Sequence, residues 1–147
     1  MTATTKDRIE KEIVIKAPRN RVWRALTTAA EFSEWFGARL DGPLQVGKTV
    51  KGQHKDIVFD MTVEKIEPET YFAYRWHPYP LPADVDYSNE PTTLVEFHLK
   101  DQPGGTLLTV VESGFDKIPG HRRDLAFRMN NDGWVGQMGN IQRYAEK

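Results

Sequence analysis

The pattern of apolar and polar residues begins with an alternation over residues 9–17. Ile9, Ile13 and Ile15 fall on one face of this segment, and Glu10 and Glu12 fall on the other. A period of two is typical of a strand with one buried face. The sequence therefore predicts that the chain opens with a half-buried β-strand.

Helical spacings follow this strand. Pro18 suits the first turn of a helix, where its missing N–H costs nothing. Thr28 and Glu31 have the spacing of a capping box, in which each side chain binds the other residue's free backbone N–H, so a second helix is predicted to begin there. Trp35 would be buried on that helix, and Gly37 can end it.

The middle of the chain, from residue 47 onward, has the pattern of short strands joined by turns. The most informative segment carries Phe72, Tyr74 and Trp76 at alternate positions, so these three aromatic side chains are expected to point inward. Gly104 and the glycine after it are typical of a hairpin turn. Strands are predicted at residues 49–54, 57–66, 70–77, 92–99 and 106–113.

The last segment has helical spacing, because apolar residues recur at intervals of four and three from Trp134 onward. Two starting points are open: the run Asn130, Asn131 and Asp132 could cap a helix that starts near Gly133, with Asp132 a favoured cap type, or the same run could kink a helix that begins near Arg122. The glycines at 133, 136 and 139 either let the sheet approach the helix closely, which we expect, or leave room for a ligand.

This order of elements predicts an α+β fold, in which a curved antiparallel sheet with two short helices wraps around a long C-terminal helix. That geometry tends to enclose an apolar hollow. Residues 78–91 contain four prolines and form either the lip of the hollow or a stiff surface connection. The side chains expected to line the hollow are those of Trp35, Phe59, Met61, Tyr74, Trp76, Val95, Phe97, Glu112 and Phe127.

Length and composition fit a single domain of 147 residues, of which 39% are hydrophobic. A net charge of −1 without a large basic cluster argues against nucleic acid as a partner. No apolar run is long enough to span a bilayer, and residues 1–8 lack the core of a signal peptide, so a cytoplasmic protein with a disordered 1–8 segment is expected. The absence of cysteine excludes thiolate nucleophiles and thiolate zinc sites, and we expect neither a metal nor a cofactor.

The sequence contains no nucleophile elbow, zinc-protease motif, phosphate-binding glycine loop or dinucleotide fingerprint. Of the histidines, His98 is expected to face solvent, whereas His54 can face inward and His77 adjoins the proline-rich segment. Glu112 shares a strand face with apolar residues, so if that face lines the interior, burial would raise the pKa of its carboxyl. The alternative is a strand end exposed to water or paired with a basic residue.

Several short segments, individually weak but specific in their order, carry a family resemblance. They are IVIKAP at 13–18, VWRALT at 22–27, Trp35 with Phe36, YRW at 74–76, ESGF at 112–115 and Gly133 with Trp134. Together they resemble the family named for the activator of the heat-shock-protein-90 ATPase, in the START-like (SRPBCC) superfamily. The resemblance covers about residues 9–144 and implies the helix-grip fold, in which an antiparallel sheet grips a long C-terminal helix.

Three classes of function follow from that resemblance, whose members bind hydrophobic molecules, transfer lipids, cyclise polyketides or assist a chaperone. The first is binding of a hydrophobic or aromatic small molecule in the hollow, which we expect. The second is a cyclase-like or hydrolase-like enzyme that uses Glu112 or a histidine as acid or base. The third is a co-chaperone module, but we expect no chaperone partner, because this chain has no room for the activator's additional N-terminal domain. A weak homodimer is compatible with all three.

Overall fold

The computed structural model describes residues 7–147. The predicted disorder of residues 1–8 therefore lies mostly outside the described residues, although Arg8 already belongs to the first strand. Among the described residues, no helix is long and apolar enough to cross a membrane. The elements are β1 (Arg8–Ile15), α1 (Arg19–Thr27), α2 (Ala29–Phe36), β2 (Arg39–Leu40), β3 (Thr49–His54), β4 (Ile57–Glu67), β5 (Tyr71–Trp76), β6 (Thr93–Gln102), β7 (Gly105–Ser113), the 3₁₀ turn η1 (Phe115–Lys117) and α3 (Gly120–Ala145).

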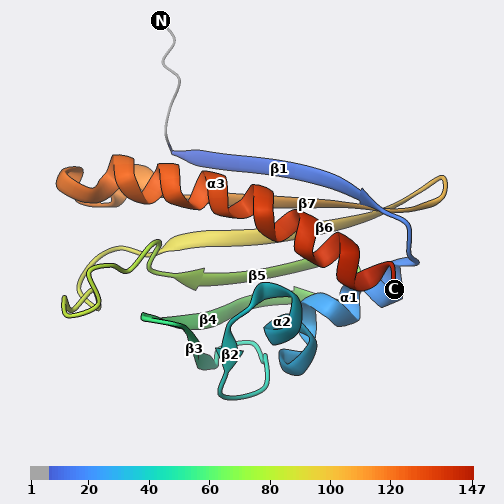
Figure 1. Ribbon diagram of the computed structural model, residues 1–147, viewed down its shortest axis with the longest axis horizontal. Helices are drawn as coiled ribbons and strands as arrows, with labels where there is room; N and C mark the ends of the chain where they lie inside the picture. The colour runs from blue at the N-terminus through green and yellow to red at the C-terminus, as the bar shows by residue number, and fades with distance from the viewer. Residues whose placement is uncertain (1–6) are drawn as a thin grey trace, which may run out of the picture.

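One seven-stranded sheet organises the molecule. Its strand order is β1-β7-β6-β5-β4-β3-β2, and every neighbouring pair is antiparallel. Helix α3 runs along the sheet beside β1, β7 and β6, while α1 and α2 lie toward the end of the molecule where α3 finishes (Figure 1). The predicted α+β architecture, a sheet wrapped around its C-terminal helix, is confirmed.

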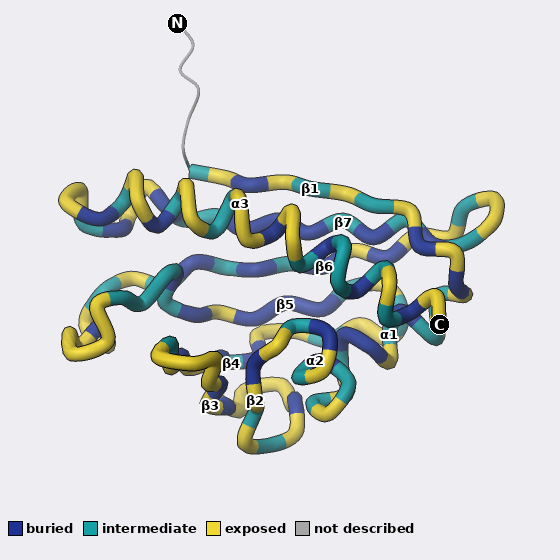
Figure 2. The backbone as a smooth tube through the Cα atoms, in the orientation of Figure 1, coloured by how far each residue is buried: buried dark blue, intermediate teal, exposed yellow. Residues whose placement is uncertain are grey.

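The core lies between the sheet and α3, because apolar residues alternate along the strands and recur on one helix face. In Figure 2 the buried parts of β5, β6 and β7 lie opposite α3. The inward orientation of Phe72, Tyr74 and Trp76 is confirmed, since all three are buried on β5. Trp134 and Met138 on α3 are buried as well, so the face predicted for the last helix is correct.

The start of α2 lies where the sequence placed it, but the predicted capping box does not form. Thr28 precedes the helix without a side-chain hydrogen bond to it. The Glu31 carboxylate instead accepts hydrogen bonds from Arg21 and Arg24, at 2.8 and 3.0 Å. Each guanidinium also brings a positive charge to the carboxylate, which a backbone N–H does not, so the two ion pairs are favoured over the cap. Gly37 ends the helix in the left-handed conformation, as predicted.

Helix α3 begins at Gly120, well before Asp132, so the interpretation of Asp132 as the helix cap was wrong and the earlier start was correct. The expected close approach of the sheet was also wrong for all three glycines, since the atoms nearest to a Cβ added at Gly139 belong to the Arg143 side chain of the same helix. A Cβ atom added at Gly133 or at Gly136 would meet no atom within 4 Å. These positions therefore face open space rather than the sheet.

One buried hydroxyl in the core provides a stability prediction. The Tyr74 hydroxyl is fully buried and has no hydrogen-bond partner among the described residues. An unsatisfied buried polar group costs about 1–3 kcal/mol, so removing it should not weaken the fold. We expect Tyr74→Phe to leave the free energy of unfolding unchanged or to raise it by about 1 kcal/mol in urea denaturation. A clear loss of stability would reveal a bound water or other partner for this hydroxyl.

Candidate functional site

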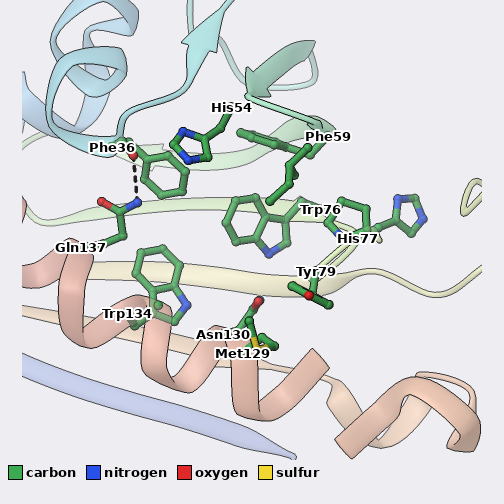
Figure 3. A pocket seen from close by; sticks show the side chains of 13 residues that line it. Phe36, His54, Phe59, Trp76, His77, Tyr79, Met129, Asn130, Trp134 and Gln137 are labelled. Atoms are coloured by element: carbon green, nitrogen blue, oxygen red, sulfur yellow. Dashed lines mark hydrogen bonds between the residues drawn. The ribbon is translucent and has the colours of Figure 1, made fainter. Parts of the chain in front are cut away.

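A pocket of about 200 Å³ opens between α3, the end of β5 and the irregular segment 78–91 (Figure 3). Five elements or connections supply its walls: α2, β3, β4, β5 with the residues after it, and α3. Its lining consists of Phe36, His54, Ile57, Phe59, Trp76, His77, Tyr79, Pro80, Met129, Asn130, Gly133, Trp134 and Gln137.

Four aromatic rings from four different elements form the apolar wall. The ring centroid of Trp76 lies 5.4 Å from Phe59, 6.0 Å from Phe36 and 6.0 Å from Trp134. The ring planes of Phe59 and Trp76 are nearly perpendicular, at 84°. Aromatic pairs at these separations attract one another beyond simple burial. The wall is therefore held in place by its own contacts and presents ring faces and edges to the hollow.

A glycine in β3 makes room for one of these rings. Gly52 pairs directly with Phe59 across β3 and β4. A Cβ atom at Gly52 would lie 2.3 Å from the Phe59 ring, far closer than any real contact. The missing side chain lets the Phe59 ring lie across the neighbouring strand, which is a recognised use of glycine within a sheet. The sequence feature behind this part of the wall is thus a glycine on the partner strand.

The proline-rich segment covers one side of the pocket and is fastened to α3 by a single arginine. Arg122 is 8% exposed and donates to the carbonyl oxygens of Pro78 and Tyr79, both at 3.0 Å. It also donates to the Glu90 carboxylate at 2.8 Å, and its guanidinium lies 4.6 Å from the Tyr87 ring centroid. The segment therefore leaves the sheet as an irregular connection whose two ends are bound to one side chain.

Beneath the aromatic wall lies the carboxyl group of Glu112, which is completely buried. Its oxygen Oε2 accepts hydrogen bonds from Trp76 Nε1 at 2.8 Å and from Thr93 Oγ1 at 2.5 Å. Its oxygen Oε1 accepts from Trp134 Nε1 at 2.8 Å. Asn130 Nδ2 donates to both oxygens, at 3.0 and 3.1 Å. Glu112 thus links β5, β6 and α3 from its place on β7.

Sheet register explains why these groups meet. Trp76 lies opposite Thr93, and Glu112 lies opposite Val95, two residues further along β6. Residues two apart on a strand share a face, so Thr93, Trp76 and Glu112 all project toward α3. Among the described residues no basic side chain forms an ion pair with Glu112, and Arg75, the partner considered from the sequence, is exposed and binds Glu64. Of the two alternatives for Glu112, the one that places its side chain in the interior is therefore correct.

Burial is the largest influence on Glu112 and raises the pKa of its carboxyl above the ordinary value of 4.5, while its four hydrogen-bond donors oppose that rise. All four groups approach as donors, which is the arrangement that fits an ionised carboxylate. Both oxygens are fully engaged by protein groups. Glu112 consequently holds side chains in position and offers no free oxygen to a ligand.

The direction of this pKa shift gives a pH-dependent prediction. A raised pKa means that the folded protein binds the proton more tightly than the unfolded chain, so the stability contributed by Glu112 is fully present below about pH 4.5 and declines as the pH rises through the folded-state pKa. We expect the stability of the wild type relative to Glu112→Gln to decrease between about pH 4 and pH 8 in urea denaturation. A constant or growing difference would mean that the pKa is not raised.

The structure brings together some of the residues predicted to line a hollow and separates others. Phe59 and Trp76 line the pocket, and Glu112 lies directly beneath it. The side chains of Trp35, Met61, Tyr74, Val95 and Phe97 lie in the packed core away from the pocket, and Phe127 packs against Phe115 with ring centroids 5.2 Å apart. Their inward orientation was predicted correctly, but close packing leaves no space beside them.

Sequence reasoning missed most of the pocket wall that α3 supplies. Asn130 and Gln137 lie four residues before and three after Trp134, on the same side of the helix. Starting the helix at Pro119, a residue type favoured at helix starts, would have revealed this face. Of the histidines, His54 and His77 line the pocket, whereas His98 is exposed as predicted. Within residues 7–147 no cluster of three His, Asp or Glu side chains could hold a metal ion.

Comparison with known proteins identifies the family. Residues 16–146 match the family described as Activator of Hsp90 ATPase homolog 1-like protein. The chain belongs to this family. This match confirms the family resemblance drawn from the sequence. No match was found among curated proteins.

Solved structures share the fold of this family member over nearly its whole length. DynU16, a protein from the dynemicin biosynthetic locus, is 25% identical and covers 96% of this chain with a TM-score of 0.77, and the chain spans 48% of that protein. MLL2253 from Mesorhizobium loti is also 25% identical, with 93% and 95% of the two chains covered and a TM-score of 0.77. The Aha1 dimer from Colwellia psychrerythraea is 21% identical, with 95% and 96% covered and a TM-score of 0.75.

Proposed function

We propose that this protein binds a small hydrophobic, aromatic molecule in the pocket between α3, β5 and the proline-rich segment. The observation that carries the proposal is the wall of four aromatic rings around an open volume of about 200 Å³. Ligand sites in proteins are typically concave and mostly apolar, with a few polar groups that fix orientation. The modest volume favours a flat molecule of one or two rings over a lipid chain.

The arrangement of polar groups supports binding rather than catalysis by Glu112. A general acid or base must reach the proton that it transfers. The Glu112 carboxyl is completely buried, and its two oxygens are occupied by Trp76, Thr93, Asn130 and Trp134. We therefore assign Glu112 as a positioning residue that holds both indole rings of the pocket wall, in place of the ligand-anchoring role expected from the sequence.

Two glycines of α3 allow a matched test of the pocket. A side chain at Gly133 would project into the pocket that this residue lines, whereas Gly136 lies three residues further on and outside the lining. Neither position has an atom within 4 Å of an added Cβ, so both backbones can accept a leucine. Replacing glycine within a helix also gains up to about 1 kcal/mol in helix propensity.

We expect Gly133→Leu to abolish binding of a naphthalene-based fluorescent probe and Gly136→Leu to leave the binding unchanged, while both variants remain folded. Titration of the probe, followed by its emission and by tryptophan quenching, measures the two dissociation constants. Equal binding by both variants, or no binding by the wild type, would contradict the proposal. Native mass spectrometry of the freshly purified protein would then identify any molecule that occupies the pocket.

Other expectations from the sequence stay predictions. The Colwellia Aha1 protein is a dimer, and a weak homodimer of this chain is still a prediction to be checked by analytical ultracentrifugation. The cytoplasmic location and the lack of a chaperone partner also stay predictions, the second testable by adding the chain to a heat-shock-protein-90 ATPase assay.

A further inference from the structure

We propose that the pocket selects ligands that donate a hydrogen bond, and that Asn130 Oδ1 accepts it. The ligand class is a flat aromatic molecule with a hydroxyl or N–H group, such as a phenol or an aryl amine. This inference rests on the proposed binding function and specifies its chemistry. It follows from a comparison of the polar atoms of the lining: most donors already form hydrogen bonds within the protein, whereas several acceptors do not.

The orientation of the Asn130 amide is determined by Glu112. Its Nδ2 atom lies 3.0 and 3.1 Å from the two carboxylate oxygens of Glu112. Carboxylate oxygens accept hydrogen bonds, so the amide nitrogen must face them and the amide oxygen must face elsewhere. In Figure 3 the side-chain oxygen of Asn130 points away from α3, toward the space between Trp76 and Tyr79. The pocket thus receives a fixed acceptor.

Most hydrogen-bond donors of the pocket lining already bind other groups of the protein. The indole N–H groups of Trp76 and Trp134 both bind Glu112. Gln137 Nε2 donates to the Phe36 carbonyl oxygen at 2.9 Å, and Gln137 Oε1 accepts from Asn140 at 3.1 Å. A ligand that only accepts hydrogen bonds would therefore find neither indole N–H free, and of these groups only the second N–H of Gln137 Nε2 is left to donate.

The two histidines of the lining add further acceptors. His54 Nδ1 lies 2.5 Å from the Gly37 carbonyl oxygen, and His77 Nε2 lies 3.0 Å from the Glu90 carbonyl oxygen. A carbonyl oxygen only accepts, so these nitrogens carry the hydrogens, and in the neutral imidazoles the other ring nitrogens are acceptors. The Tyr79 hydroxyl is the exception, since it can donate as well as accept. Acceptors therefore outnumber donors around the hollow.

Three probes of nearly equal shape test this selection on the wild-type protein. Naphthalene has no hydrogen-bonding group, 2-methoxynaphthalene has only an acceptor, and 2-naphthol has a donor. We expect 2-naphthol to bind at least about tenfold more tightly than 2-methoxynaphthalene, because a buried site built to accept a hydrogen bond discriminates against a ligand without the donor. Equal binding of all three would overturn the donor selection while the binding function stands. Failure of all three to bind would overturn both.

A pair of variants assigns the acceptor. Asn130→Leu should reduce the preference for 2-naphthol over 2-methoxynaphthalene to less than about threefold. Asn131→Leu makes the same change at the next residue of α3, outside the pocket lining, and should preserve the preference. An unchanged preference in Asn130→Leu would overturn the assignment to Asn130. If Asn130→Leu fails to fold, the assignment is tested instead in the wild type by the change in the Asn130 side-chain amide signals on binding of 2-naphthol but not of 2-methoxynaphthalene.

Discussion

Glu112→Gln is expected to lower the free energy of unfolding by about 3 kcal/mol at pH 7, because it replaces an oxygen that accepts hydrogen bonds by an amide nitrogen that cannot accept any. The amide nitrogen of glutamine would take the place of one carboxylate oxygen and face an indole N–H of Trp76 or Trp134. Within residues 7–147 neither indole N–H has a second acceptor, so at least one buried N–H would lose its partner. Urea denaturation followed by circular dichroism measures the loss.

Glu96→Gln is the matched control for this prediction. Glu96 is on β6, is only partly buried, and accepts a hydrogen bond from the Tyr71 hydroxyl on the outer side of the sheet. A glutamine oxygen can accept the same hydrogen bond, so the change should stay within about 0.5 kcal/mol. If Glu112→Gln were no more destabilising than Glu96→Gln, the five hydrogen bonds to Glu112 would not hold the floor of the pocket together.

Arg122→Met is expected to destabilise the protein by about 3 kcal/mol and to release the proline-rich segment. Removing one partner of a buried ion pair leaves the other charge uncompensated, which typically costs about 3–5 kcal/mol. The Glu90 carboxylate and the carbonyl oxygens of Pro78 and Tyr79 would lose their common donor. Because Tyr79 and Pro80 line the pocket, binding of a naphthalene probe should weaken together with stability.

Hydrogen exchange resolves the two parts of this prediction. Backbone amides of residues 78–91 should exchange faster in Arg122→Met than in the wild type, while those of β6 and β7 keep their relative protection. Arg128→Met, at an exposed position of the same helix, serves as the control and should change neither exchange nor binding. Unaltered exchange across residues 78–91 in Arg122→Met would show that other contacts hold the segment.

The fold could be predicted from local patterns because each pattern reflects a single element. The alternation in β5 and the spacing of Trp134 and Met138 in α3 are set by the geometry of one strand or one helix. Where two side chains competed for the same group, the prediction failed. Glu31 has the spacing of a capping residue, but Arg21 and Arg24 from the preceding helix bind it instead.

The pocket could be predicted only in part, because facing inward does not distinguish packed core from open space. Tyr74 and Phe97 face inward like Trp76, yet their rings pack against neighbours, 5.8 and 6.2 Å from the ring of Phe72. The floor around Glu112 is built from residues of four elements, so no spacing along the sequence could predict it. Asn130 was considered only as part of a helix start, and its place beside Trp134 follows once the helix begins at Gly120.

The most direct measurement of the central claim uses the indole N–H signals of the four tryptophans in a ¹⁵N–¹H spectrum during titration with 2-naphthol. Trp76 and Trp134 line the pocket, whereas Trp35 donates its N–H to the Ala25 carbonyl oxygen at 2.7 Å and, like Trp23, lies outside the lining. The account predicts saturable shifts for Trp76 and Trp134 with one dissociation constant, and no shift for Trp23 and Trp35. Unmoved signals from Trp76 and Trp134 at saturating probe, or shifts confined to the other two tryptophans, would contradict it.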